Sequence, residues 1–334
     1  MTAPRIVVIV LNWNGKADTL QCLESLANLS YSNFETLVVD NGSQDGSVPA
    51  IRERFPGTKL IETGKNLGYA EGNNVGIVAA LESGCDFVLL LNNDTVVDPI
   101  LLTEFVKAAE ERSDAGVFGA KIYRYTERDI WYAGARWHPE FLRFEVVVDE
   151  LEYGDAMGRL VETDYACGCA LFVRRSVLEN IGLLEPSFFL TYEEVDFCFR
   201  ARRAGFAVLY VPRAIVWHKV SVSFGGAESP LMSYFMTRNY LLWTERNLTR
   251  AQSRAARVLA LRRLKWNLLP KFPGTRDWRM MSPVSLVQAI VKYVADAREL
   301  WAKPSNRGMF WGTAHYFMRR FGPAPDFVRQ LGRP

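Results

Sequence analysis

Over the first 120 residues, short apolar runs alternate with longer amphipathic segments. The runs lie at residues 5–11, 34–40, 58–63, 86–92 and 115–120, and their length and β-branched or leucine-rich composition predict strands. Apolar residues at helical spacing occupy residues 19–29, 46–55, 69–84 and 99–112, with Pro99 near a helix start. Strands that alternate with helices predict a parallel α/β sheet covered on both faces.

After residue 120 the pattern changes. Residues 121–174 are alternating, aromatic and turn-rich, which favours antiparallel or mixed strands. A helix is expected from about residue 192 to 204, where Gly205 ends it, and AVLYV and IVWHK are each expected to form a short strand. From residue 231 onward, amphipathic helices are expected, with breaks at Pro270, Pro273, Pro283 and Pro304. The sequence thus predicts a body of residues 1–230, with halves 1–120 and 121–230, and a helical region of residues 231–334.

Polar residues gather where three of the predicted strands end. The first strand ends in Asn12-Trp13-Asn14-Gly15, the second in Asp40-Asn41-Gly42-Ser43 and the fourth in Asn92-Asn93-Asp94. Ligands of α/β sheets bind at the carboxyl ends of the strands. We therefore expect these three strand ends to line one ligand-binding crevice.

Composition narrows the class of protein. The chain has 334 residues, of which 49% are hydrophobic and 23% charged, as in a folded globular protein. A membrane span needs about 18 consecutive apolar residues, and the sequence contains no such run. The N-terminal segment also lacks the layout of a signal peptide, so we expect a cytoplasmic protein. The five cysteines show neither paired metal knuckles nor a disulfide framework, and we expect reduced thiols. The CGC sequence at 167–169 favours core packing, with a metal pair as the alternative.

Charge is divided unevenly along the chain. Residues 231–334 hold 19 lysines and arginines against 5 aspartates and glutamates, a balance of +14. Residues 1–230 hold 21 against 32, a balance of −11. An acidic body with a basic tail indicates an anionic partner for the tail, either nucleic acid or the surface of an acidic membrane.

The strand ends carry their own chemistry. Neither a GxGxxG turn nor a GxxxxGK[ST] loop is present, so the sequence has no dinucleotide fingerprint and no P-loop. Carboxylates and amides instead suit recognition of a base and ribose, and coordination of a divalent cation. Asp40 could accept the N3–H of a uracil or thymine ring, or serve only in a turn. Asp94 suits Mg²⁺ or Mn²⁺ bridging a diphosphate, or caps the helix that follows.

Two later features have both a structural and a catalytic interpretation. Glu193, Glu194 and Asp196 fall in the first turn of the helix predicted at 192–204, where carboxylates complement the helix dipole. Alternatively, one of these carboxylates is a general base that takes a proton from an attacking hydroxyl. His218, one of three histidines, is either simply packed or a second ligand to a metal at Asp94.

Taken in order, these pieces resemble the family-2 glycosyltransferases with the GT-A fold, especially the bacterial branch that contains rhamnosyltransferases. The matching segments span about residues 5–225 and are VLNWNG, VVDNGSQDGS, NLGYAEGNNVG, LLLNNDTVVDP, CGCALFVRRSVLENIGLLEPSFFLTYEEVDFCFRARRAGF and VWHKVSVSFG. The resemblance implies a GT-A type mixed sheet flanked by helices. It also implies inverting transfer of a sugar from a nucleoside diphosphate sugar to an acceptor hydroxyl, with Mg²⁺ or Mn²⁺ on the diphosphate.

The resemblance assigns roles by position. Asp94 matches the last acid of the family's Asp-x-Asp metal motif, and His218 matches the later histidine that completes the site. Glu194 matches the second acid of the family's Glu-Asp pair, the general base, with Glu193 its neighbour. The residues expected around the donor are Asn12, Asn14, Asp40, Asn41, Ser43, Asn66, Gly68, Asn73, Asn92, Asn93 and Asp94. Those expected on the acceptor side are Asp196, Cys167, Gly168 and Arg238.

Two positions depart from the family pattern. The metal motif reads Asn92-Asn93-Asp94, so one acid of the motif remains. The second acid of the base motif is a glutamate, which moves its carboxylate one methylene further out and leaves open whether Glu193 or Glu194 is catalytic. The expected donor is dTDP-rhamnose, with a UDP-sugar as the alternative. The expected acceptor is a cell-envelope glycan or a glycan linked to a lipid pyrophosphate.

The basic tail lies outside the matching segments. Its tryptophans stand among many arginines, an arrangement that fits the headgroup layer of an anionic membrane; they are Trp243, Trp266, Trp278, Trp301 and Trp311. The alternative is a helical subdomain that packs on the body or on a second subunit of a homodimer. Nucleic acid is not an expected partner, because no recognised motif accompanies the charge.

Two other functions stay open from the sequence. One is a catalytically silent module that binds a nucleotide sugar or a glycan, which the depleted metal motif makes thinkable. The other is nucleotidyl transfer to a sugar phosphate, although the glycine- and lysine-rich phosphate loop expected near the N-terminus is missing.

Overall fold

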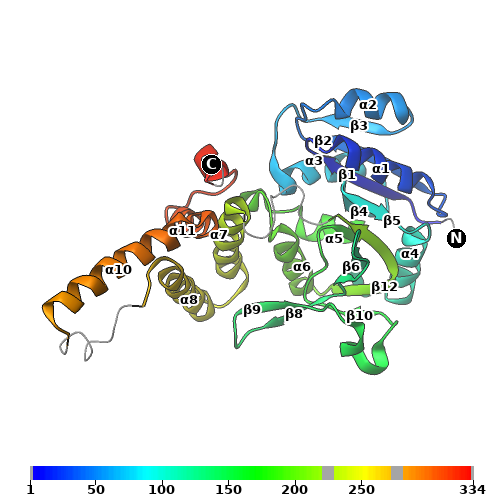
Figure 1. Cartoon of the computed structure of the whole chain (residues 1–334). Helices are drawn as coiled ribbons and strands as arrows, with labels where there is room; N and C mark the ends of the chain where they lie inside the picture. The colour runs from blue at the N-terminus through cyan, green and yellow to red at the C-terminus, as the bar shows by residue number, and fades with distance from the viewer. Residues whose placement is uncertain (1–2, 220–228, 272–280, 332–334) are drawn as a thin grey trace. The chain divides into compact units, whose positions relative to one another are not determined.

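The computed structural model describes residues 3–219, 229–271 and 281–331 (Figure 1). The chain divides into two compact units, Met1–Val220 and Ser221–Pro334, which we take one at a time. The boundary expected at residue 230 lies ten residues beyond this division. Residues 220–225 of the VWHKVSVSFG segment, together with Pro273 and Trp278, lie outside the described residues.

The first unit alternates strands and helices in its first half and is richer in strands in its second. The first half contains β1 (Ile6–Asn12), α1 (Lys16–Ala27), β2 (Phe34–Asp40), α2 (Ser47–Arg54), β3 (Lys59–Glu62), α3 (Gly68–Glu82), β4 (Phe87–Asn92), β5 (Thr95–Val97) and α4 (Leu101–Glu111). The second half contains β6 (Ala115–Arg124), β7 (Ile130–Tyr132), β8 (Ala135–His138), β9 (Arg143–Val146), η1 (Glu150–Ala156), β10 (Val161–Glu162), β11 (Ala170–Arg174), α5 (Arg175–Ile181), η2 (Pro186–Phe188), α6 (Glu193–Arg203) and β12 (Ala207–His218).

Ten of the described strands form one mixed sheet. Its order is β10-β12-β6-β11-β4-β1-β2-β3, with β5 added to β12 and β7 added to β6. Strand β1 lies between β2 and β4 and runs parallel to both, so that Asn12 faces Asp40 and Leu11 faces Asn92. Strand β11 is antiparallel to both of its neighbours, β4 and β6. The expected meeting of three strand ends is therefore confirmed.

Two apolar layers lie on opposite faces of the sheet, because successive side chains of a strand point to opposite sides. Val8 of β1 packs in a layer with Phe105 of α4 and residues of α1 and α2. Ile9, its neighbour in the strand, packs in a layer with Ile77 of α3, Phe197 of α6 and residues of α5. Helices thus cover the sheet on both sides (Figure 1), as the buried central strands predicted.

The second half of the unit corrects one prediction. The segments AVLYV and IVWHK, apart from Lys219, belong to a single strand, β12, which pairs with β6 along its length. The register between the two strands shifts between Val211 and Ile215, so β12 carries three extra residues there. Pro212 in this bulge has no N–H to give to the ladder, which is why the sequence looks like two strands. The short strand β5, directly after Asp94, was not expected either.

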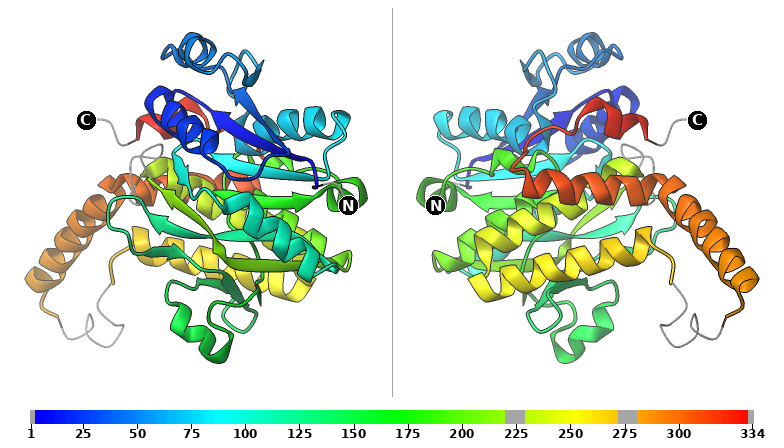
Figure 2. Two further views of the ribbon diagram at one scale, coloured as in Figure 1. Left: turned by 90° about the vertical axis from the view of Figure 1, so that its right-hand side faces the viewer. Right: turned by 90° about the vertical axis from the view of Figure 1, so that its left-hand side faces the viewer.

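The second unit is helical, as the sequence predicted. It contains α7 (Pro230–Asn247), α8 (Arg250–Leu268), α10 (Pro283–Ala302), α11 (Pro304–Phe317) and α12 (Asp326–Gln330). Pro283 and Pro304 are the first residues of their helices, where a missing N–H costs nothing. Helices α7 and α11 pack side by side (Figure 2), and the Tyr234 hydroxyl lies 2.7 Å from Nδ1 of His315. None of the described helices combines the length and apolarity that a membrane crossing requires.

Candidate active site

Asn12 ties the tips of β1, β2 and β4 together. Its side chain is completely buried. The Nδ2 group donates to Oδ1 of Asp40 at 2.8 Å and to Oγ of Ser43 at 3.1 Å. The Oδ1 atom accepts three hydrogen bonds, from the Gly15 N–H (3.2 Å), the Thr19 hydroxyl (2.8 Å) and the Asn93 amide (3.3 Å). The residue expected to touch the donor therefore also holds the three strand tips together.

The turns after β1 and β2 are bonded to each other. Asp40 is almost fully buried, and its second carboxylate oxygen accepts the backbone N–H of Ser43 at 2.9 Å. Asn14, at φ 52°, accepts the Gln44 N–H through its Oδ1 at 2.7 Å, and its own N–H donates to the Ser43 hydroxyl. A carboxylate oxygen accepts more than one hydrogen bond, so each oxygen of Asp40 keeps capacity for a ligand N–H.

Asn41 carries this network to the start of α3. Its Nδ2 donates to the Gly68 carbonyl at 3.0 Å, and its Oδ1 accepts the Leu67 N–H at 2.9 Å. The Oδ1 atom of Asn66 accepts the Gly68 N–H at 2.8 Å. Asn41 and Asn66 thus fix the loop between β3 and α3. Any contact that these residues make with a donor would therefore come from a fixed loop.

Asn73 and Asn74 lie within α3 and do not cap it. Asn74 bonds both backbone groups of Leu184, its Nδ2 donating to the carbonyl at 2.9 Å and its Oδ1 accepting the N–H at 3.0 Å. Asn73 donates to the Tyr69 carbonyl, and its buried Oδ1 has no partner among the described residues. Asn74 is therefore structural, while Asn73 retains an acceptor.

The tip of β4 brings Asp94 to His218, which lies 124 positions further along the chain. Pairing of β5 with β12 sets His218 opposite Thr95. As a result, Nε2 of His218 lies 3.1 Å from Oδ1 of Asp94 and 3.5 Å from Nδ2 of Asn92. Both side chains are buried, and Nδ1 of His218 has no hydrogen-bond partner among the described residues. Asn93 points instead to Asn12 and to the Thr19 hydroxyl.

Few other metal-binding side chains surround this pair. Across the described ranges, no group of three or more His, Cys, Asp or Glu side chains could hold a metal ion. All five cysteines are free thiols, as expected from their spacing. Burial raises the pKa of Cys167 to about 12 and that of Cys169 well above its ordinary value, so both thiols stay protonated. The side chains of Cys167 and Cys169 are therefore packed in the protein as protonated thiols.

Glu193 and Glu194 begin α6 as a buried pair of carboxyl groups. Glu193 is 3% exposed and Glu194 is half-buried. The Oε2 atom of each is buried with no hydrogen-bond partner in the described part of the chain. Burial, and then the neighbouring Glu194 carboxylate, raise the pKa of Glu193 well above its ordinary value. Burial raises the pKa of Glu194 to about 7.

The CGC segment lies between the two groups of side chains. The carbonyl of Cys169 accepts the Asn92 N–H at 3.0 Å, next to the tip that carries Asp94. At Gly168, one residue earlier, an added Cβ would lie 3.5 Å from Cβ of Glu194. Consecutive residues of one segment therefore contact the Asp94 side and the Glu194 side.

Two other acceptor-side candidates are engaged inside the protein. Asp196 is completely buried, and its carboxylate accepts Nε of Arg200 at 2.9 Å within α6. Arg200 also donates to the carbonyls of Ile181 and Leu183. Arg238 belongs to the second unit, where it is fully buried and donates to the Gly322 carbonyl at 2.7 Å and to the side chain of Asn239 at 2.9 Å.

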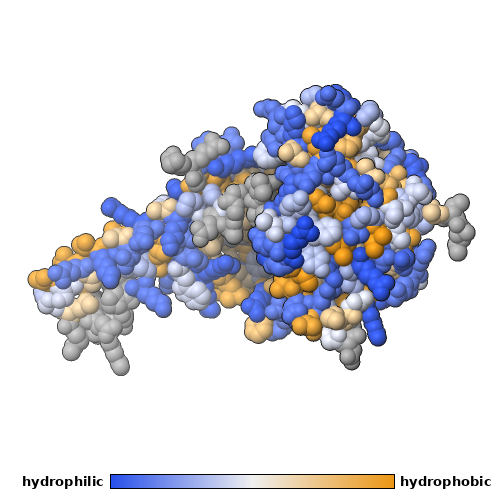
Figure 3. Space-filling model, turned by 45° about the vertical axis from the view of Figure 1, so that its right-hand side comes forward, coloured by the Kyte–Doolittle hydropathy of each residue, from blue (hydrophilic) through white to orange (hydrophobic). Residues whose placement is uncertain are grey.

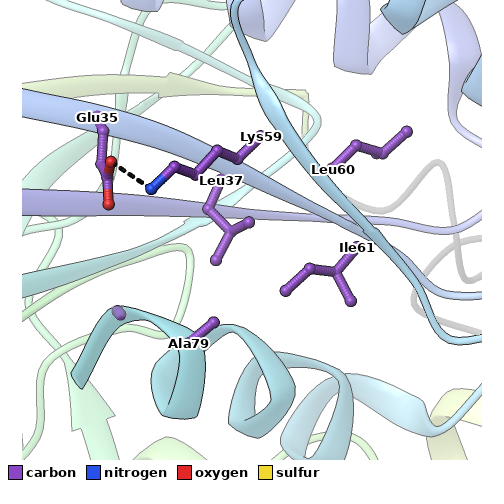
Figure 4. Close-up of a pocket in the computed structure, with 7 residues that line it drawn as sticks. Glu35, Leu37, Lys59, Leu60, Ile61 and Ala79 are labelled. Carbon is purple, nitrogen blue, oxygen red and sulfur yellow. Dashed lines mark ion pairs between the residues drawn. The ribbon is translucent and has the colours of Figure 1, made fainter. Parts of the chain in front are cut away.

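A separate hollow of about 330 Å³ lies at the edge strand β3, away from these side chains (Figure 4). It is lined by aliphatic side chains of β2, β3 and α3, among them Leu37, Leu60 and Ile61, and by the charged residues Glu35 and Lys59. An ion pair of 2.8 Å between Lys59 and Glu35 lies at the beginning of the two strands. Its lining residues include neither the tips of β1, β2 and β4 nor the start of α6, so the hollow is separate from the candidate site.

Sequence reasoning missed two residues that shape the site. Thr19 in α1 donates to Asn12 and accepts from Asn93, although it looked like an ordinary helix position. Tyr69 directly follows Gly68 in the NLGYAEGNNVG segment, and its hydroxyl donates to the Gly168 carbonyl at 2.5 Å. An aromatic residue with a polar tip next to a turn glycine was the available signal for Tyr69.

Comparison with known proteins identifies a family and relatives of this chain. The model of the family "Glycosyl transferase family 2" matches residues 7–182. An N-acetylglucosaminyl-diphospho-decaprenol L-rhamnosyltransferase of Mycobacterium tuberculosis is 27% identical over 245 residues, 67% of this chain and 79% of that protein. The dTDP-rhamnosyl transferase RfbF of Shigella flexneri is 22% identical over 252 residues, 72% of this chain and 80% of that protein.

Solved structures share the fold at low identity. A mannosyltransferase from Pyrobaculum calidifontis in complex with GDP-Man and Mn²⁺ aligns with a TM-score of 0.55 and 14% identity, over 96% of this chain and 88% of that one. GalNAc-T7 with UDP, GalNAc and Mn²⁺ aligns with a TM-score of 0.56 and 14% identity, over 72% of this chain and 48% of that one. The expected GT-A type α/β fold is confirmed.

Proposed function

The chain belongs to glycosyl transferase family 2, and on that premise we propose that it is an inverting, metal-dependent enzyme that transfers a sugar to a hydroxyl of a cell-envelope glycan. One observation carries the proposal. Gly168 and Cys169, consecutive in the chain, contact the Glu194 side and the Asp94 side of the site. An inverting displacement needs a base on one side of the anomeric carbon and a leaving-group site on the other, and this segment lies between such groups.

Glu194 is the general base in this proposal. A base works best when its pKa lies near the working pH, and burial raises the pKa of Glu194 to about 7. Burial and the neighbouring Glu194 carboxylate raise the pKa of Glu193 well above its ordinary value, which favours the protonated form of Glu193. The Oε2 atom of Glu194, which has no partner in the described residues, takes the proton of the attacking hydroxyl.

Asp94 and His218 fit a divalent cation that takes its remaining ligands from the donor. Oδ1 of Asp94 and Nε2 of His218 lie 3.1 Å apart, so both side chains would hold the same ion. One carboxylate with substrate phosphates is a usual ligand set for Mg²⁺, and an imidazole also suits Mn²⁺. When bound, the ion supplies Lewis-acid stabilisation of the leaving diphosphate. The two aligned structures are both described with Mn²⁺, which supports this assignment.

The donor that we propose is dTDP-rhamnose. The names of two relatives, an L-rhamnosyltransferase and a dTDP-rhamnosyl transferase, support this choice. Asp40 is positioned at the tip of β2 with remaining acceptor capacity and would take the N3–H of the thymine ring. Uracil offers the same N–H, so a UDP-sugar is the competing donor.

The acceptor that we propose is a glycan carried on a lipid pyrophosphate, in line with the diphospho-decaprenol in one relative's name. The second unit has a surface suited to an anionic membrane. None of the twenty residues of α10 is buried, and its exposed apolar side chains are Val284, Val287, Ile290, Val291, Val294 and Trp301. Helix α8 has no acidic residue, and its Trp266 is 74% exposed. On the face of the molecule shown in Figure 3, apolar patches lie among larger areas of hydrophilic surface.

Vesicle flotation of the full chain tests the membrane proposal. We expect binding to phosphatidylglycerol vesicles and much less to phosphatidylcholine, because basic side chains add an electrostatic attraction to apolar insertion. Val291→Asp on the exposed apolar side of α10 should reduce flotation, whereas Gln288→Asp, an exposed residue of the same helix, should leave it nearly unchanged. A chain that does not float, and whose mass by light scattering falls on Val291→Asp, would instead indicate a homodimer interface.

A donor-turnover assay tests the enzymatic proposal. Purified protein is incubated with dTDP-rhamnose, UDP-N-acetylglucosamine or GDP-mannose, each with Mn²⁺, with Mg²⁺ or with chelator, and release of the nucleoside diphosphate is measured. We expect steady release that needs the metal and is fastest with dTDP-rhamnose. Tight donor binding without any release, in the presence of candidate acceptors, would support the silent binding module instead.

A further inference from the structure

The backbone immediately before Glu193 and Glu194 is held in an unfavourable conformation. Phe189, Thr191 and Tyr192 have φ angles of 64°, 68° and 73°, in the left-handed region that non-glycine residues rarely adopt. Glu193 and Glu194 follow directly. Such conformations persist only where the surrounding structure imposes them, and they concentrate at functional sites. Contacts with the start of α3 hold this connector, residues 189–192, in place.

The start of α3 holds one end of this connector. The carbonyl of Phe189 accepts the Tyr69 N–H at 2.6 Å and the Ala70 N–H at 3.5 Å. Gly68, at φ 84°, makes the approach possible, because a Cβ there would lie 2.5 Å from the Phe189 carbonyl oxygen. The connector is thus clamped against a glycine that no other residue could replace without moving it.

The side chain of Tyr69 contacts the CGC segment, which lies on the other side of Glu193 and Glu194. Its hydroxyl donates to the Gly168 carbonyl at 2.5 Å. An added Cβ at Gly168 would lie 3.2 Å from that hydroxyl and 3.5 Å from Cβ of Glu194, so the three groups are in close contact. Burial, and then the charges of Glu193 and Glu194, raise the pKa of Tyr69 well above its ordinary value, so the phenol remains a donor.

The same helix start is bonded to the donor side. Asn41, next to Asp40 at the tip of β2, donates to the Gly68 carbonyl and accepts the Leu67 N–H. An unbroken series of hydrogen bonds and backbone therefore runs from the β2 tip, through residues 67–69, to Phe189 and on to Glu193.

We infer that Tyr69 is a positioning residue for the general base. Its N–H fixes the connector before α6 and its hydroxyl fixes Gly168, so that Glu194 is held between them and shielded from water. Tyr69 does not itself need to touch substrate. The inference rests on the proposed role of Glu194 as the base. Besides Glu193, the ionisable groups close to Glu194 are Tyr69 from α3, Tyr192 before α6, Tyr165 and Cys167 before β11, and Cys198 in α6.

The test removes the hydroxyl and keeps the ring. In full-length Tyr69→Phe, kcat for nucleoside diphosphate release should fall about tenfold, the effect of one lost hydrogen bond of the stronger kind. The assay uses whichever of dTDP-rhamnose, UDP-N-acetylglucosamine and GDP-mannose the wild type turns over, with Mn²⁺. The dissociation constant of that nucleotide's diphosphate, measured by calorimetry, should stay within about twofold, because the donor side keeps its own bonds.

A second variant and a matched control separate positioning from general damage. Tyr69→Leu admits water to the carboxyl pair, so the acid limb of the kcat–pH profile should move about one unit toward lower pH. Tyr31→Phe removes a tyrosine hydroxyl that likewise donates to a backbone carbonyl, that of Pro4 at 2.6 Å, and should change neither kcat nor the profile.

The outcomes discriminate clearly. Wild-type kcat in Tyr69→Phe together with an unshifted acid limb in Tyr69→Leu overturns the inference, and so does a parallel loss of nucleotide binding in Tyr69→Phe, which would show a structural role. Glu194→Gln is measured alongside. If Glu194→Gln is inactive while the Tyr69 variants behave as wild type, only the positioning role fails. If Glu194→Gln keeps wild-type turnover, the proposed base itself fails.

Discussion

The tips of β1, β2 and β4 and the start of α6 are both rich in polar side chains, yet they differ in how those side chains are satisfied. At the strand tips, the side chain of Asn12 alone takes part in five hydrogen bonds, and the carboxylate of Asp40 accepts two. At α6, Glu193 and Glu194 each keep a buried oxygen without a partner in the described residues. Buried polar groups are normally bonded, so the exceptions are where chemistry is expected. In the proposed function, the first region holds the donor and the second exchanges a proton.

The largest expected effect on turnover is at the start of α6, where buried carboxyl oxygens lack a hydrogen-bond partner in the described residues. Glu194→Gln keeps the shape of the side chain and removes its ability to take a proton, so kcat should fall about 10²- to 10⁴-fold. Calorimetric affinity for the nucleoside diphosphate with Mn²⁺ should be unchanged. Glu53→Gln, at an exposed position of α2, is the matched control and should have wild-type turnover. Near-normal rates in Glu194→Gln would mean that the two regions do not differ in the way described.

At the hydrogen-bonded tips of β1, β2 and β4, the largest effect of a substitution should be on the stability of the fold. Asn12→Ala leaves Asp40 and Thr19 with buried groups that have lost a partner, at an expected cost of about 3 kcal/mol in the free energy of unfolding. Denaturant titration measures this cost. Asn28→Ala, an exposed asparagine that donates to the Glu24 carbonyl, should cost well under 1 kcal/mol. Equal costs for the two variants would contradict a structural role for the Asn12 network.

Removing the metal-side carboxylate should weaken binding while leaving folding intact. Asp94→Ala is expected to weaken metal-dependent binding of the nucleoside diphosphate about 10- to 100-fold, since His218 alone remains. Calorimetry with and without Mn²⁺ measures the difference, and exposed Asp114→Ala serves as control. An unchanged affinity in Asp94→Ala would show that the donor's phosphates bind without this tip.

The smallest expected effect is on the pH dependence of thermal stability, through the carboxyl group of Glu194. The folded pKa of Glu194, about 7, lies above the ordinary value of 4.5, so its protonated form is favoured by folding. That stabilising contribution is complete below pH 4.5 and is lost as the pH rises through about 7. Glu194→Gln should therefore raise Tm at pH 8 by about 2 to 4 °C, and by less at pH 5. A lower Tm for Glu194→Gln at pH 8 would show that its charged form is stabilised in the fold.

The fold was predictable because its signals are local. The buried strands stand out as apolar runs, and the parallel order of β2, β1 and β4 follows from the crossover helices between them, so the meeting of Asp40 with Asn12 could be foreseen. The roles of amides within the network could not, since Asn12 draws partners from β2, from α1 and from the turns after β1, β2 and β4. Nor does the sequence signal the left-handed backbone at Phe189, Thr191 and Tyr192, because none is a glycine or asparagine.

The bulge in β12 has a consequence for how far this chain can vary in length. Ala207–Val211 and Ile215–His218 are each pinned separately to β6, and only the three residues between them are unpaired. Insertions or deletions at the bulge would leave both registers intact. One residue removed between Ile215 and His218 would turn His218 to the opposite face of the sheet, away from Asp94. Homologous enzymes are thus expected to tolerate indels at the bulge and to exclude them from the four residues that follow.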